Sequence, residues 1–307
     1  MSTSVTTSVI ADIPLKTSTW WGVLSDVVEL TKPRISILVL ITVTVAAHLA
    51  SWGHTEPGLI AWTLIGTIGF AASASAFNQW LEVERDAMMP RTAERPLPAG
   101  RLPSAFVVLF GGFMLLGGLL VTGLFVNLAA AGWGLLTWAT YVLVYTPLKT
   151  RTAGNTAVGA VAGALPLFIG WSAVGVPLDY RAWGLWLILF LWQFPHFMAI
   201  AWLYRFDYAK GGFQMLTTVD PSGRRAGVQA VLAAAVLVPV SLVPALGLPN
   251  SAAVGYMLAA CLLGLGQLVL AVWFLGTRNE VSARWLLRGS LIYLPAVMLL
   301  LAILPWV

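Results

Sequence analysis

The chain has 307 residues, of which 59% are hydrophobic and only 9% are Asp, Glu, Lys or Arg. Soluble domains carry roughly 25% charged and about 45–50% apolar residues, so this composition excludes a soluble globular enzyme and a disordered chain. The net charge of +5 does not predict a nucleic acid partner, because membrane proteins collect Lys and Arg in their cytoplasmic loops. The single cysteine, Cys261, excludes an internal disulfide framework and a cysteine-based zinc site.

Residues 1–34 form the first of two expected regions. They show no secretory signal, and about the first 17 of them are polar and expected to be mobile. An amphipathic stripe follows, which predicts a helix lying at the membrane interface. The alternative is a helix continuous with the first span, which Pro33 disfavours. The stripe consists of Trp20, Trp21, Val23, Leu24, Val27 and Val28.

Residues 35–307 are predicted to form a single all-α transmembrane domain. A spanning helix needs about 20 predominantly apolar residues. The division between the third and fourth stretches of this kind rests on Asn127 alone. The nine stretches cover residues 35–52, 58–80, 104–126, 128–145, 157–176, 183–203, 226–246, 252–275 and 285–304.

The distribution of basic residues predicts the orientation of the chain. Of the 17 Lys and Arg residues, all except Arg181 fall on one side of a nine-span arrangement. Because Lys and Arg concentrate in cytoplasmic loops, that side is predicted to be cytoplasmic. We therefore expect a multi-pass protein of a bacterial inner membrane, with a cytoplasmic N-terminus and a C-terminus on the outer side.

Three polar side chains stand out at the end of the second span. Asn78, Glu82 and Asp86 are spaced four residues apart, which places them along one face of a helix. Three oxygen ligands on one stripe suit Mg²⁺, which commonly bridges carboxylates to substrate phosphates. A charged helix end is the structural alternative, but Asn78 lies deeper than such an end requires.

Two basic clusters lie on the same side of the membrane. Arg91 and Arg95 occur in a proline-rich loop after the stripe, and their planar donor groups match phosphate oxygens. Lys149 and Arg151 follow the fourth span, and Asn155 opens the next helix. Ordinary positive charge of a cytoplasmic loop is the alternative. The neighbouring carboxylates favour a diphosphate-binding role instead.

A third polar group ends the sixth span. His196 lies inside the span, and an ionisable residue there is a functional hypothesis by default. Asp207 follows eleven residues later, so both side chains could share a helical face unless Pro195 kinks the helix. Lys210 is close by. With the first two groups, these residues predict a cytoplasm-facing pocket for a diphosphate on a lipid-soluble tail, with Mg²⁺ and basic residues stabilising the leaving group.

The motifs resemble those of the UbiA-type intramembrane prenyltransferases and, among them, the protoheme IX farnesyltransferases (heme O synthases). The Asn78-x3-Glu82-x3-Asp86 stripe resembles the first acidic motif of that superfamily. The resemblance covers residues 30–219, and the last three spans match only in hydropathy. The narrower resemblance rests on Leu30 to Ile35, Met89 to Thr92, Arg95 to Leu97, Tyr145 to Lys149, Pro195 to Phe197, and Asp207 to Leu216.

The resemblance implies nine helices around a central cavity open to the cytoplasm. It also implies transfer of the farnesyl group of farnesyl diphosphate to a vinyl group of heme B, with addition of water, giving heme O. A heme A synthase is the further partner expected, because the product needs onward processing. Carried over by position, Asn78, Glu82, Asp86 and Asp207 would hold Mg²⁺; Arg91, Arg95, Lys149, Arg151, Lys210 and Asn155 would bind diphosphate; and His196 would position heme or water.

Two positions depart from the family pattern. Gly211 stands where the second acidic motif would carry another aspartate, and Pro166 is single where a proline pair is expected. A prenyltransferase acting on an aromatic or quinone precursor is the first alternative, which a complete second motif would favour. A membrane transporter is the alternative from another class. The polar residues gather at one rim only, which gives no path across the membrane.

Overall fold

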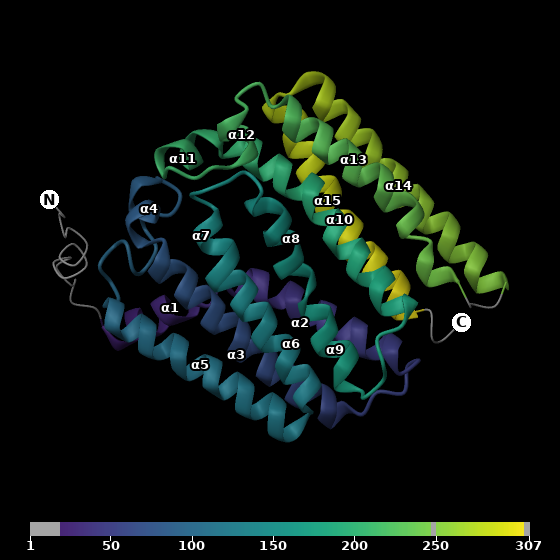
Figure 1. The fold of residues 1–307 in the computed structure, drawn as a ribbon, viewed down its shortest axis with the longest axis horizontal. Helices are drawn as coiled ribbons and strands as arrows, with labels where there is room; N and C mark the ends of the chain where they lie inside the picture. The colour runs from purple at the N-terminus through teal and green to yellow at the C-terminus, as the bar shows by residue number, and fades with distance from the viewer. Residues whose placement is uncertain (1–18, 247–249, 304–307) are drawn as a thin grey trace, which may run out of the picture.

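The computed structural model describes residues 19–246 and 250–303, and all regular elements of this part are helices (Figure 1). Within it, nine segments are long and apolar enough to cross a membrane, which confirms the predicted number of spans. The expected mobile segment over the first 17 residues lies outside the described residues, as does the last residue of the ninth predicted span. The nine segments are Pro33–Ala50, Pro57–Leu81, Ser104–Phe125, Leu128–Leu148, Asn155–Ala173, Tyr180–Leu203, Arg224–Ala245, Ala252–Thr277 and Glu280–Ile303.

Some spans are single helices and others are built from two or three pieces. The fourth span consists of α6, a π-helical turn η1 and α7, and the fifth consists of α8 and α9. The elements are α1 (Trp20–Leu30), α2 (Pro33–Ala50), α3 (Pro57–Leu81), α4 (Val83–Met88), α5 (Ser104–Phe125), α6 (Leu128–Ala139), η1 (Thr140–Tyr145), α7 (Thr146–Leu148), α8 (Asn155–Ala164), α9 (Pro166–Ala173), α10 (Tyr180–Leu203), α11 (Arg205–Lys210), α12 (Leu216–Val219), α13 (Arg224–Val240), η2 (Val243–Ala245), α14 (Asn250–Thr277) and α15 (Glu280–Ile303).

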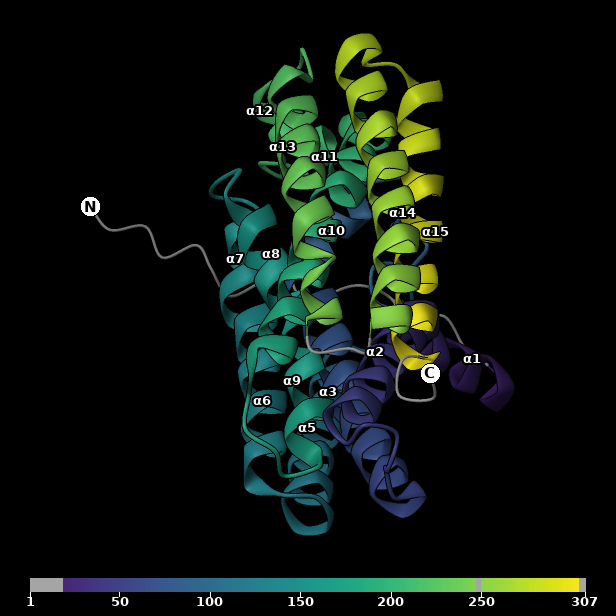
Figure 2. The same cartoon turned by 90° about the vertical axis from the view of Figure 1, so that its right-hand side faces the viewer.

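The amphipathic N-terminal stripe forms a separate helix, α1, at the outer edge of the bundle beside α2 (Figure 2). Trp20 and Trp21 are 64% and 65% exposed, so this helix keeps an apolar face uncovered. Arg101 fastens α1 to the bundle through ion pairs of 2.8 Å with both Asp26 and Glu29. The location of α1 at a membrane interface stays a prediction.

The spans pack as two groups of helices. Helices α2, α3, α5, α6, α8 and α9 form one group, and α10, α13, α14 and α15 form the other (Figure 1). The groups meet where α10 packs on α8 and α9, and where α15 packs on α2. The largest core cluster lies across this junction and includes the fully buried Phe168, Trp171, Ile188 and Tyr293. The short helices α4, α11 and α12 gather at one end of the bundle (Figure 1).

Asn127 makes the turn between the third and fourth spans. Its side chain accepts a hydrogen bond from the Ala130 amide at 2.8 Å and caps α6. The same side chain donates to the backbone carbonyls of Ser172 and Ala173 at 2.8 and 3.1 Å. The Asn127 side chain therefore caps the fourth span and fastens the turn to α9, and the break between α5 and α6 confirms the predicted division.

Candidate active site

The acidic stripe forms one wall of a buried chamber. Helix α3 ends at Leu81, and Glu82 adopts a non-helical backbone before α4 begins. Backbone hydrogen bonds from Glu82 to Asn78 and from Asp86 to Glu82 still span this break, at 3.1 and 2.8 Å. The stripe therefore keeps its alignment although the helix is interrupted, and Asn78, Glu82 and Asp86 are only 1%, 5% and 1% exposed.

The chamber has a volume of about 170 Å³ and brings together segments that are far apart in the sequence. Basic and acidic side chains face each other across it, and tyrosines complete its walls. The lining residues are Lys32, Asn78, Glu82, Asp86, Met89, Arg91, Arg95, Tyr141, Tyr145, Lys149, Tyr208, Phe213 and Met215.

Each carboxylate of the chamber is paired with a basic side chain. The Nζ atom of Lys149 lies 2.9 and 3.1 Å from the two carboxylate oxygens of Glu82. Arg95 donates to Asp86 at 2.5 Å. Burial raises the pKa of Asp86 by removing water from its carboxylate, and Arg95 opposes that shift. Burial disfavours the charged form of Lys149 as well, but Glu82, Tyr145 and Tyr141 together outweigh it and hold the pKa of Lys149 above its usual range.

Lys32 also lines the chamber, although the predicted site residues do not include it. Its Nζ atom donates to the side-chain oxygen of Asn78 at 2.9 Å. Its backbone has a φ of 50°, a conformation that non-glycine residues rarely adopt, and it lies directly before Pro33 at the start of α2. Burial, together with Arg95 and Lys149, lowers the pKa of Lys32 to about 7. The sequence feature that could have indicated a role for Lys32 is its position directly before Pro33, at the edge of the first span.

The π-helical turn η1 places two tyrosines in the chamber. Pro147 has no backbone N–H for a regular helical bond, and the amide of Thr146 bonds to the Tyr141 carbonyl five residues earlier. The Thr146 hydroxyl donates to the same carbonyl at 2.9 Å. Tyr145 lies beneath Lys149, whose Nζ atom is 4.7 Å from the ring centroid. Nothing in the hydropathy pattern predicts this turn.

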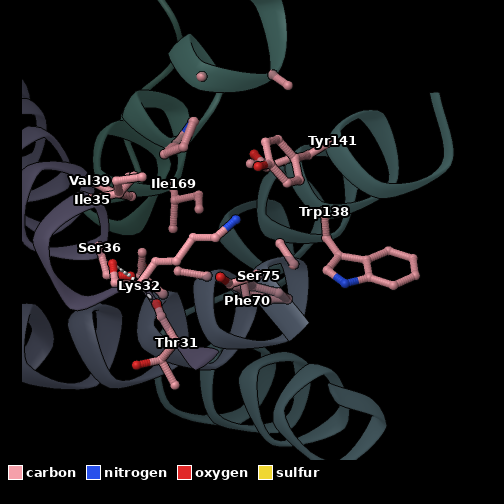
Figure 3. A pocket seen from close by; sticks show the side chains of 17 residues that line it. Thr31, Lys32, Ile35, Ser36, Val39, Phe70, Ser75, Trp138, Tyr141 and Ile169 are labelled. Atoms are coloured by element: carbon pink, nitrogen blue, oxygen red, sulfur yellow. Dashed lines mark hydrogen bonds between the residues drawn. The ribbon is translucent and has the colours of Figure 1, made fainter. Parts of the chain in front are cut away.

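An apolar pocket of about 150 Å³ adjoins the chamber (Figure 3). Lys32 and Tyr141 line both spaces, so the charged chamber continues into the apolar one at these two side chains. Among the residues that the structure describes, Lys32 is the only charged one that lines the pocket, and its side chain extends across it (Figure 3). The other lining residues are Thr31, Ile35, Ser36, Val39, Thr67, Phe70, Ala71, Ala74, Ser75, Thr137, Trp138, Ala162, Gly163, Pro166 and Ile169.

The structure brings only some of the predicted phosphate-binding residues to the chamber. Arg91 lines it and lies over the Tyr204 and Tyr208 rings, with its guanidinium carbon 4.9 and 5.9 Å from the two centroids. Arg151 is exposed and does not line it. Asn155 is fully buried, and its amide donates to the carbonyls of Thr152 and Gln214 at 2.7 and 3.0 Å.

Asp207 and Lys210 lie on α11, and neither lines the chamber; Tyr208 is the residue of α11 that does. Within the described chain, no three His, Cys, Asp or Glu side chains converge on one metal position. The chamber therefore offers a pair of carboxylates, Glu82 and Asp86, together with the Asn78 amide oxygen.

His196 lies outside the lining of both spaces. Helix α10 continues through Pro195 and ends at Leu203, before Asp207, so His196 and Asp207 do not share a helical face. The Nδ1 atom of His196 is 2.9 Å from the Ser290 hydroxyl on α15. The contact between His196 and Ser290 could not be predicted from the sequence, because the two residues are 94 positions apart.

Comparison with known proteins gives three concordant findings. The family model of the UbiA prenyltransferases matches residues 39–305. A protoheme IX farnesyltransferase of Rhodopirellula baltica is 44% identical over 287 residues, covering 90% of this chain and 98% of the relative. A protein of the same name from Solibacter usitatus is 43% identical, covering 89% of this chain and 96% of the relative.

Solved structures share the fold at low sequence identity. A structure described for digeranylgeranylglyceryl phosphate synthase has a TM-score of 0.74 at 16% identity and covers 92% of this chain and 98% of its own. A UbiA homologue of Archaeoglobus fulgidus, bound to DMAPP and Mg²⁺, has a TM-score of 0.66 at 14% identity, with coverage of 91% and 100%. The nine apolar helices and the family match show a multi-pass membrane protein, and the solved structures share its fold. The chain belongs to the UbiA prenyltransferase family.

Proposed function

We propose that the protein is a heme O synthase. It transfers the farnesyl group of farnesyl diphosphate to a vinyl group of heme B with addition of water, and releases diphosphate. The assignment of a prenyl diphosphate as donor rests on the charged chamber, which continues into an apolar pocket at Lys32 and Tyr141. These two spaces match the charged part and the apolar part of such a substrate. The assignment of heme B as acceptor rests on the relatives, which are named protoheme IX farnesyltransferases and are 44% and 43% identical to this chain.

The donor set of the chamber fits Mg²⁺. Glu82 and Asp86 supply carboxylate oxygens and Asn78 an amide oxygen, all hard ligands, and Mg²⁺ is usually held by one or two carboxylates plus substrate phosphates. We assign these three residues to the metal. Bound there, the ion would stabilise negative charge on the leaving diphosphate. Asp207, which lies outside the chamber lining, is proposed as a peripheral acidic group for metal entry.

The basic residues of the chamber hold the diphosphate in this proposal. Lys32, Arg91, Arg95 and Lys149 line the space, and their charges favour an anion that gains negative charge as the carbon–oxygen bond breaks. Two exposed basic residues, Arg151 and Lys210, are proposed to attract the diphosphate before it enters. Asn155 is proposed to act indirectly, by fixing the backbone of the segment that follows Lys149.

The apolar pocket receives the prenyl tail and protects the reacting carbon. The allylic carbon–oxygen bond breaks with its electron pair on the diphosphate oxygen, and the carbocation forms where Tyr141 lines both spaces. The Tyr141, Trp138 and Phe70 rings surround this region, and aromatic faces stabilise cations. The vinyl group attacks the cation, water adds to the adjacent carbon, and the proton that this water loses passes to the released diphosphate. His196 is proposed to position the heme.

We propose that this chamber faces the cytoplasm in a bacterial inner membrane, with the N-terminus inside and the C-terminus outside, because Lys and Arg concentrate in cytoplasmic loops. The product carries a new apolar tail and needs further oxidation to become heme A. We therefore propose a heme A synthase as the partner that takes up the product.

The proposal is tested with detergent-purified protein, heme B, farnesyl diphosphate and Mg²⁺. The expected result is a heavier heme in the mass spectrum, with the mass of heme B plus a farnesyl group and a hydroxyl group, which disappears when EDTA is added. Farnesylation of a quinone precursor, with heme left unmodified, would overturn the assignment of the acceptor. Diphosphate release with neither acceptor modified would overturn transfer itself.

A further inference from the structure

We infer that the Nε2 atom of His196 is an axial ligand of the iron of the porphyrin acceptor. This inference rests on the proposed function, because it places the second substrate relative to the prenyl pocket.

The hydrogen bonds around Ser290 determine which nitrogen of His196 carries the proton. The Ser290 hydroxyl lies 2.7 Å from the Leu287 carbonyl oxygen, which can only accept, so the single hydroxyl hydrogen is donated there. The Ser290 oxygen must then accept at the 2.9 Å contact with Nδ1 of His196. Nδ1 therefore carries the proton, and Nε2 carries the lone pair that binds metals.

The imidazole is held rigidly in this orientation. Its ring stacks on Trp192 with the centroids 4.9 Å apart and the planes at 25°, and Phe197 lies at 5.7 Å. Trp192 is itself fixed, since its indole N–H donates to the Ser290 carbonyl at 2.7 Å. One residue of α15 therefore fixes both the ring and the residue on which the ring stacks.

The Nε2 atom has no hydrogen-bond partner within the described chain. An imidazole in a spanning helix with one nitrogen satisfied and the other open is the arrangement of a histidine metal ligand, whose second N–H is held by a neighbouring group. His196 is partly exposed, so a ligand can reach it. A neutral imidazole is also the usual axial ligand of heme iron.

Trp192 and Gln193, one turn before His196 on α10, connect this part of the helix to its neighbours. Trp192 bonds to α15, and Gln193 donates to the Ala160 carbonyl on α8 at 2.9 Å. His196 lies one turn beyond this pair, on the face between α15 and α8. The amide of Gln193 also occupies the space beside Gly163, and Gly163 lines the pocket. The Gln193 amide thus connects the face of α10 that carries His196 with the wall of the prenyl pocket.

The test uses the full-length protein with ferrous protoporphyrin IX and reads the bond directly. The resonance Raman spectrum is expected to show an iron–histidine stretching band, which is lost in His196→Ala and restored by added imidazole. His48→Ala, in another spanning helix, is the matched control and keeps the band. Metal-free protoporphyrin IX, followed by tryptophan fluorescence, is expected to bind the wild type and His196→Ala equally.

Ser290→Ala distinguishes a positioning residue from a merely structural one. Loss of its hydrogen bond changes the electron density of the imidazole, so the band is expected to shift in frequency, with heme affinity reduced by about tenfold. In a His196→Ala background the same change is expected to have no further effect. A band that persists in His196→Ala, or wild-type protein that gives no band, would overturn the inference, whereas the heme product assay decides separately on farnesyl transfer.

Discussion

Lys149 and Arg95 are the side chains that make the buried carboxylates of the chamber tolerable. Removing water from Glu82 and Asp86 costs several kcal/mol per ion, which their 2.9 and 2.5 Å partners offset. Removing Lys149 or Arg95 would leave a buried carboxylate unpaired and destabilise the fold. A loss of activity in such a variant would therefore not by itself show a role in catalysis. Uncharged isosteres of the carboxylates separate these effects better, because they keep volume and one hydrogen-bonding oxygen.

Glu82→Gln and Asp86→Asn are each expected to lower turnover by roughly 10²–10³-fold, because each removes a charged oxygen ligand of the metal that stabilises the leaving group. Activity measured against Mg²⁺ concentration should also show a higher requirement for the metal. Glu84→Gln is the matched control, since the Glu84 side chain is exposed on the same segment. Full activity of both chamber variants would contradict the metal assignment.

Lys32→Met is expected to raise the KM for farnesyl diphosphate about 10- to 100-fold, the range for loss of a charge-assisted hydrogen bond to a phosphate oxygen. The turnover number should fall less than the affinity. Arg34→Met, two residues along the chain and exposed, serves as the control for general loss of positive charge. Equal effects of the two substitutions would assign Lys32 to long-range attraction rather than to contact.

At the scale of helices, hydropathy predicted the spans because burial in lipid is a property of each segment by itself. The spacing of Asn78, Glu82 and Asp86 likewise predicted a shared wall, since three residues four apart stay aligned even across the break at Glu82. The π-helical turn was not predictable in this way. It depends on Pro147 together with the space that Gly159 leaves on a neighbouring helix. Lys32 was missed because its contact with Asn78 spans 46 residues.

Gly159→Ala is expected to displace the Tyr145 ring, because a methyl group built there would lie 2.6 Å from that ring. The ring cannot yield without moving η1 and the Lys149 above it. We expect farnesyl transfer to fall by about tenfold or more, and the midpoint of thermal unfolding to decrease, as overpacking costs typically 1–3 kcal/mol. Gly132→Ala on α6 meets nothing within 4 Å and should behave as wild type. Equal activity of both variants would show that η1 tolerates the shift.

At the scale of the whole molecule, the end of the bundle that carries the chamber also carries the basic loops. Labelling of single cysteines tests the orientation in a Cys261→Ala background. His54→Cys is expected to react with a membrane-impermeant maleimide in intact spheroplasts, and Thr152→Cys only after lysis, because their loops follow the first and the fourth span, which end on opposite sides of the membrane. The reverse pattern would invert the molecule and place the chamber on the outer side.

The paired charges of the chamber have a consequence for how its ligands arrive. A divalent cation alone would have to displace Lys149 and Arg95 and leave them facing the metal, and an anion alone would leave Glu82 and Asp86 without partners. Binding of either ligand alone is therefore unfavourable, because it leaves chamber charges unpaired that the other ligand would neutralise. By thermodynamic reciprocity, metal and diphosphate must raise each other's affinity by the same factor. The empty enzyme is thus protected from capture by free phosphate or by the cation alone, and is committed only when both are present.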